Sequence, residues 1–262
     1  MRLTFLGTGT SFGVPQVGCH CATCTSTDPR DSRTRTSALV ESTGGTRLLI
    51  DTAPELRLQL IAAGVDRVDA VLFTHDHADH THGIDDIRSL SIRHEAPLPV
   101  YGSRATLTSL ARKFSYIFDD AVRPLPGTYK PEGRCCTLED GESVRIGDLD
   151  VTAAAVPHGG VPVLAFRIGP LAYITDAKLV PPSTLERMRG ADVLVLNALL
   201  RTEHPTHLSL AEAIDVAREI GAGRTFLTHL THHTRHAELE AELPDGIAPA
   251  YDGLVVITGE AR

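Results

Sequence analysis

Residues 70–80 read Ala-Val-Leu-Phe-Thr-His-Asp-His-Ala-Asp-His, a short apolar run that passes at once into histidines and aspartates. The apolar part predicts a buried strand whose end carries the polar part to the surface. Imidazole nitrogens and carboxylate oxygens are ligands for zinc and manganese. A solvated, histidine-rich loop is the ordinary alternative, but packing does not explain so many clustered ligands. The stretch therefore predicts a centre that holds two metal ions.

The composition favours one globular domain spanning residues 1–262, with 42% hydrophobic and 22% charged residues. The net charge of −8 argues against stable binding to nucleic acid. The sequence shows neither an apolar run long enough to span a membrane nor the pattern of a secretory signal. We therefore expect a cytoplasmic protein without a membrane partner.

Strands and helices alternate along the chain, which predicts an α/β sandwich with polar residues at strand ends. Thr52 is expected to cap a helix, and residues 119–139 are expected to form a loop. The expected helices span 55–63, 84–92, 103–114, 182–189 and 210–220; the expected strands span 2–6, 38–41, 47–51, 70–73, 143–146, 150–156, 163–168, 171–175, 193–196, 224–228 and 251–256.

Three further polar residues follow expected strands and so reach the same kind of position as the histidine run. They are His158, Asp176 and His229. A polar residue at a strand end is unremarkable by itself. Position alone does not assign any of the three to the centre at residues 75–80.

Three cysteines crowd into a long loop without periodicity. Cys19, Cys21 and Cys24 have C-x-C-x-x-C spacing, which suits three thiolate ligands of one zinc ion with a fourth ligand from elsewhere. A reducing compartment favours that interpretation over disulfides. Cys135 and Cys136 are interpreted as incidental free thiols.

The pattern H-x-H-x-D-H resembles the metallo-β-lactamase superfamily, whose members bind one or two metals at the edge of an αββα sandwich. The resemblance implies two ligand sets joined by a bridging carboxylate, and it gives Asp51 a supporting place beside the metals. Asp76 is not a ligand in this pattern. The first set is His75, His77 and His158, the second is Asp79, His80 and His229, and the bridge is Asp176.

The opening Leu6-Gly7-Thr8-Gly9-Thr10, the thiolate cluster and residues 227–232 together resemble the cyclic phosphodiesterase family of the bacterial carbon–phosphorus lyase pathway. That resemblance runs over nearly the whole chain. It implies a structural zinc held by the three cysteines and His232, which pins the N-terminal loop; His20 and His233 remain rival fourth ligands. It also implies that His207 contacts the phosphate and protonates the leaving oxygen. The ordinary alternative is that His207 only caps or precedes the helix that begins at residue 210 and has no catalytic part. His82 and His204 are unassigned.

These features predict a metal-dependent phosphodiesterase that acts on a small cyclic phosphate of a ribose or nucleoside. Catalysis is assigned to His207 and Asp79, with two divalent ions (zinc or manganese) in the site and one structural zinc. The alternatives are a tRNA 3′-processing endonuclease, which usually carries a long basic arm, and an ester, thioester or lactam hydrolase of the same fold. A non-catalytic zinc-stabilised module, like the relative in pyrroloquinoline quinone synthesis, would be expected to have a damaged site. A homodimer is left open.

Overall fold

The computed structural model describes residues 1–94 and 96–259, which form two seven-stranded sheets. The first sheet has the order β14 (Val255–Ile257), β1 (Arg2–Gly7), β2 (Ser37–Glu41), β3 (Arg47–Ile50), β4 (Ala70–Leu72), β5 (Leu98–Gly102) and β6 (Gly133–Thr137). The second has the order β13 (Ile247–Pro249), β12 (Arg224–Thr228), β11 (Val193–Asn197), β10 (Leu171–Ile174), β9 (Val161–Ile168), β8 (Leu149–His158) and β7 (Ser143–Ile146).

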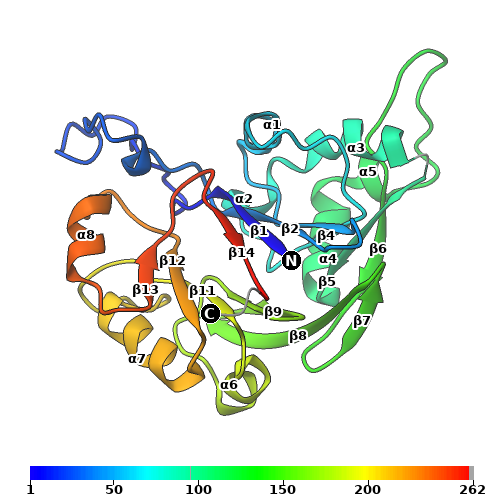
Figure 1. Cartoon of the computed structure of the whole chain (residues 1–262). Coiled ribbons are helices and arrows are strands. Elements are labelled where there is room, and N and C mark those ends of the chain that lie inside the picture. Colours follow the sequence, from blue (N-terminus) through cyan, green and yellow to red (C-terminus); the bar gives the residue numbers. More distant parts are fainter. Residues whose placement is uncertain (95, 260–262) are drawn as a thin grey trace.

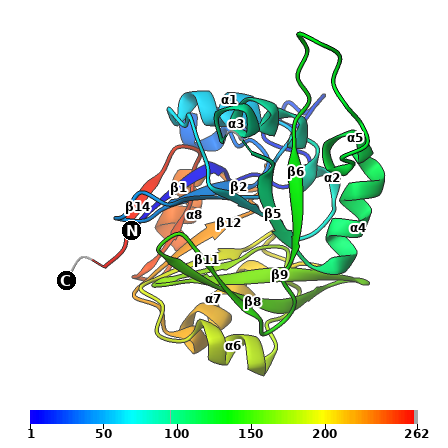
Figure 2. The ribbon, with the colours of Figure 1, turned by 90° about the vertical axis from the view of Figure 1, so that its right-hand side faces the viewer.

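Helices cover the outer face of each sheet, so that the order of layers is αββα, as Figures 1 and 2 show. The helices are α1 (Leu56–Ala62), α2 (Ala78–Thr81), α3 (Ile87–His94), α4 (Arg104–Lys113), α5 (Ser115–Phe118), α6 (Pro182–Met188), α7 (Leu210–Ile220) and α8 (His236–Glu242), with 3-10 turns at Pro29–Asp31 and Ile84–Asp86. Within the described ranges, none of these helices is long and apolar enough to cross a membrane. The predicted fold class is confirmed.

The core has three parts, which correspond to the spaces between the four layers. Phe5 of the first sheet and Phe166 and Tyr173 of the second belong to the cluster between the sheets. A second cluster joins the second sheet to α6, α7 and α8, and a third joins the first sheet to α1, α3 and α4. Apolar side chains project from both faces of the inner strands. For this reason these strands appear as continuous hydrophobic runs in the sequence.

Each sheet contains a parallel half, and this arrangement positions the site. In the first sheet β3, β4, β5 and β6 are parallel, and in the second β10, β11, β12 and β13 are parallel. The carboxyl ends of parallel strands meet at one edge of a sheet. The residues that follow β3, β4, β10 and β12 can therefore converge.

Several local expectations were wrong. The segment expected as a loop contains β6, whose side chains are mostly exposed and show no apolar alternation. Thr52 does not cap a helix: α1 begins at Leu56 after Glu55, and the Thr52 hydroxyl donates to the carbonyl oxygen of Thr81 at 3.1 Å. The elements α2, α5, α8, β5 and β13 were not expected. Residues 119–132 project from the body of the molecule as a long loop before β6 (Figures 1 and 2).

Candidate metal centre

The polar run after β4 turns sharply into α2, and this turn spreads its side chains around one point. The ligand atoms of His75 and His77 lie within 4.8 Å of each other and of a nitrogen of His158, at the end of β8. The ligand atoms of Asp79, His80 and His229 form a second group, also within 4.8 Å of one another. His229 in this group directly follows β12. The structure thus brings together both ligand sets inferred from the sequence.

Asp176 lies between the two groups. Its carboxylate lies within 4.8 Å of ligand atoms of His75 and His80, one from each set. The distances are 3.3 Å from Oδ2 to His80 Nε2 and 3.2 Å from Oδ1 to His229 Nε2. A carboxylate in this place can bridge two ions.

Three residues of the site region have a left-handed backbone conformation, which residues other than glycine rarely adopt. They are Asp51 at φ 60°, directly after β3, Asp176 at φ 56°, two residues after β10, and His229 at φ 58°, directly after β12. Such conformations cost about 1–3 kcal/mol each and persist where the surroundings hold them. The strained backbone therefore coincides with the convergence of ligands.

Hydrogen bonds at Nδ1, on the side of the ring away from the centre, fix the orientation of His75, His80 and His158. Asp51 Oδ2 lies 2.8 Å from His80 Nδ1, the carbonyl oxygen of Thr206 lies 2.9 Å from His158 Nδ1, and Thr74 Oγ1 lies 3.0 Å from His75 Nδ1. A partner at Nδ1 leaves Nε2 directed toward the centre, which is how proteins orient metal-binding imidazoles. Asp51 thus occupies the supporting place inferred from the sequence.

The electrostatics of the centre call for cations. Burial opposes the charged form of His80, but the carboxylates of Asp176, Asp79 and Asp51 outweigh it and raise the pKa of His80 well above its usual value. Burial likewise disfavours an ionised Asp176, yet His229 and His80 hold its pKa well below the usual range. Positive charge beside Asp176 thus favours its ionised form, whereas burial raises the pKa of Asp51. Divalent ions would supply that charge in place of protons.

Buried nitrogen atoms without partners also fit bound metals. Among the described residues, His75 Nε2, His80 Nε2 and both ring nitrogens of His229 are buried and make no hydrogen bond of acceptable geometry. Leaving such atoms unpaired costs about 1–3 kcal/mol each. Mixed nitrogen and oxygen donors suit zinc or manganese.

The cysteine cluster meets His232 and forms a second centre. His232 Nδ1 lies 3.2, 3.5 and 3.6 Å from the sulfur atoms of Cys19, Cys21 and Cys24. Zn–S and Zn–N bonds of about 2.3 and 2.0 Å in a tetrahedron place sulfur and nitrogen about 3.6 Å apart. The donor set therefore fits a structural zinc, and of the three candidate histidines it is His232 that joins the group.

This second centre is tied to the first by a short stretch of backbone. Leu230 donates to the carbonyl oxygen of Thr8 at 2.8 Å, and Thr10 donates to the carbonyl oxygen of Leu230 at 3.2 Å. The buried guanidinium of Arg33 donates to the carbonyl oxygens of Thr231 and Thr234. The segment carrying His229 and His232 is thus held against the N-terminal loop.

His207 lies beside the two ligand groups and Asp176. Its Nε2 atom is 3.1 Å from Asp176 Oδ1, and its ring stacks on that of His229 at 4.9 Å between centroids. Helix α7 is capped by Ser209, whose hydroxyl accepts from the backbone of Glu212 while the Glu212 carboxylate accepts from Ser209. His207 therefore does not serve as the helix cap.

Other polar residues play parts that the sequence did not reveal. Asp76, which the family pattern leaves out of the ligands, accepts hydrogen bonds from Ser109 and Lys113 at 2.5 and 2.9 Å. His204 Nδ1 lies 3.3 Å from His207 Nδ1, whereas His82 packs edge-on against Phe114, 5.5 Å away. The carbonyl group of Thr206 carries no side-chain signal, so sequence patterns cannot find it.

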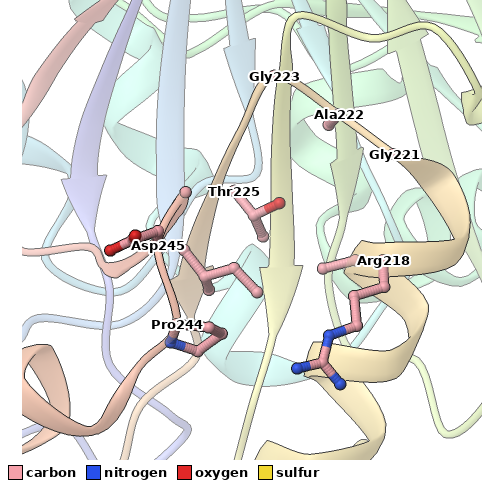
Figure 3. Close-up of a pocket in the computed structure, with 10 residues that line it drawn as sticks. Arg218, Gly221, Ala222, Gly223, Thr225, Pro244 and Asp245 are labelled. Carbon is pink, nitrogen blue, oxygen red and sulfur yellow. The ribbon is translucent and has the colours of Figure 1, made fainter.

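A cavity of about 570 Å³ lies at the opposite end of β12 from His229. Figure 3 shows it between the end of α7, with Arg218 and Gly221, and the turn at Pro244 and Asp245. Its lining contains none of the candidate ligands. The convergence of ligands, rather than this cavity, marks the functional site.

Comparisons with known proteins agree with this geometry. Residues 46–230 match the model of the beta-lactamase superfamily domain. A diphosphatase from the PhnP family is 36% identical in sequence, has a TM-score of 0.90 and is matched over 98% of each chain. Ribonuclease Z of Methanopyrus kandleri is 30% identical over 87% of this chain and 93% of its own length.

An octanoyltransferase of Porphyromonas gingivalis is 40% identical over 99% of this chain. The chain spans about half, 52%, of the length of that relative. The similarity therefore concerns one part of a longer protein.

Proposed function

This chain belongs to the metallo-β-lactamase superfamily, and from that premise we propose that it is a phosphodiesterase that uses two divalent metal ions. Its substrate is a small cyclic phosphate of a ribose or nucleoside. The observation that carries the proposal is His207 Nε2 at 3.1 Å from the bridging carboxylate of Asp176. An imidazole in that position can serve an oxygen that departs from phosphorus beside the metals.

The two ligand sets and Asp176 would hold the ions, which when bound bind phosphoryl oxygens and make hydroxide available near neutral pH. Hydrolysis adds a water oxygen to phosphorus and breaks one phosphorus–oxygen ester bond. His207 donates a proton to the departing oxygen. Burial lowers the pKa of His207 against the opposing effect of Asp176, so protonated His207 is a stronger acid than a free imidazolium but is the minor form near neutral pH. Asp79 also takes part in catalysis, because its ionised carboxylate can orient the attacking water.

A tRNA 3′-processing endonuclease is the second candidate, favoured by similarity to proteins named ribonuclease Z. The projecting loop of residues 119–132 would be the place to grip RNA. It carries Arg123 and Lys130 but also Asp119, Asp120 and Glu132. Because its charges do not sum to a basic surface, we rank this candidate lower. Salt-sensitive binding of precursor tRNA in a gel-shift assay would reverse the ranking.

The test compares hydrolysis of 2′,3′-cyclic AMP and bis(4-nitrophenyl) phosphate by protein loaded with Mn²⁺ or Zn²⁺. We expect His207→Ala to lower kcat about 10²–10⁴-fold with metal content unchanged. His82→Ala is the matched control, because His82 packs against Phe114 outside the ligand groups. Fully loaded protein that turns over neither phosphodiester would refute the proposal, and diphosphate, ester, thioester and lactam substrates would then be compared.

A further inference from the structure

A second cavity, of about 250 Å³, opens beside His207 and is separate from the cavity in Figure 3. Three segments that follow strands form its walls: the loop after β1, the segment after β11 and the segment after β12. The lining residues that matter here are Phe12, Gln16, Leu199, Leu200, His204 and His207. The catalytic function proposed above leaves this space without a role.

The cavity lies on the side of His207 toward which the departing ester oxygen of the substrate would point. One wall is His207, which faces Asp176 at 3.1 Å through Nε2. A phosphate at the metals whose ester oxygen takes a proton from His207 must extend toward that histidine. The group attached to the ester oxygen therefore reaches the cavity.

The chemistry of the walls favours a neutral, flat group. Leu199 and Leu200 are apolar, Gln16 offers amide donors and acceptors, and Phe12 is 65% exposed at the surface. In the described part of the chain, no lysine, arginine, aspartate or glutamate lines this cavity, but four histidines do: His204, His207, His232 and His233. Arg35 lies close to Gly13 but is paired with Glu55 at 3.1 Å. A second phosphate would thus meet imidazoles of the wall but no lysine or arginine side chain in it.

We propose that this cavity binds the base of a nucleoside 2′,3′-cyclic phosphate, with Phe12 stacking on the base. The proposal rests on the phosphodiesterase function and narrows its substrate from ribose or nucleoside cyclic phosphates to those that carry a base. An exposed aromatic ring is suited to this task, because stacking tolerates any base and favours binding of each. Gln16 can add hydrogen bonds to the base edge.

The experiment compares kcat/KM for 2′,3′-cyclic AMP and for the cyclic 2,3-phosphate of 1-O-methylribose, which has no base. We expect wild type to prefer the nucleotide about 10-fold or more, and Phe12→Ala to remove most of that preference through KM. Phe12→Tyr should retain it. Val17→Ala is the control, because Val17 is 97% exposed in the same loop and does not line the cavity.

Equal turnover of both substrates by wild type, or an equal loss on both in Phe12→Ala, would overturn the proposal. Adenosine binding to the metal-loaded protein, measured by calorimetry, separates the two levels of inference. Binding that weakens about 10-fold in Phe12→Ala supports the base site even if neither phosphodiester is hydrolysed. Absence of adenosine binding together with base-independent hydrolysis rejects the site and leaves the phosphodiesterase function intact.

Discussion

Substitution of Asp51 by asparagine should weaken metal binding without disrupting the fold. Asp51 is fully buried and accepts three hydrogen bonds of 2.8 Å, from the backbone and hydroxyl of Thr74 and from His80 Nδ1. Asparagine keeps the volume and tolerates the left-handed backbone. If its oxygen serves the Thr74 amide, its NH2 group faces His80 Nδ1 and favours the proton on Nε2. That nitrogen is then no longer free to bind a metal.

Loss of such supporting contacts typically costs 10–100-fold in metal affinity, or about 1.4–2.7 kcal/mol. Competition with a chelator, monitored by elemental analysis, measures this change for zinc and manganese. Asp252→Asn is the control, because Asp252 accepts hydrogen bonds from Thr8 and Thr34 and belongs to neither ligand group. Wild-type affinity in Asp51→Asn would show that the Asp51 contact does not prepare His80 for a metal.

Three further outcomes follow from burial and charge. In metal-free protein at pH 7, iodoacetamide should label Cys21 before Cys24, because the backbone N–H of Cys24 lowers the pKa of Cys21 to about 6 while burial raises that of Cys24 to about 11; equal labelling by peptide mass mapping would contradict this. Phe166→Ala should lower the free energy of unfolding in urea by about 3–5 kcal/mol, whereas the exposed Phe12→Ala should leave it nearly unchanged. Burial raises the pKa of Asp252, so the folded protein keeps this proton to higher pH than the unfolded chain does. Wild type should therefore lose stability relative to Asp252→Asn as pH rises from about 4 through the raised pKa, and a rising difference in urea titrations would be the opposite of the expected sign.

The candidate ligands could be found in the sequence because each follows an apolar run that reads as a buried strand. The family pattern that begins at residues 75–80 carried the prediction of the downstream ligands, and the structure places Asp176 and His229 each in a group with residues of the run after β4. The contacts that orient these ligands were harder to find. The carbonyl group of Thr206 holds His158, and every residue type has a carbonyl group.

Two of the missed elements, β6 and α8, lie at the surface, whereas the missed strand β5 is an inner strand of the first sheet. The strand β6 is a sheet edge with mostly exposed side chains, so no alternation of apolar residues marks it. In α8 the residues described as buried are His236 and Leu239, which is too few to give a helical period. Contacts with other parts of the fold determine both β6 and α8, and the local sequence pattern does not contain those contacts.

The parallel bridge between Gly9 and Leu230 bears on the order in which a newly made chain can acquire its metals. The first strand leaves the ribosome long before the segment that carries Leu230 is translated. At about 5–20 residues per second, the interval is roughly 10–40 s. During that interval Cys19, Cys21 and Cys24 lack His232, and the ligand group of Asp79 and His80 lacks His229. Both centres are completed in one late event, so a ribosome stalled in between would display three free thiols on a chain unable to close around its ions.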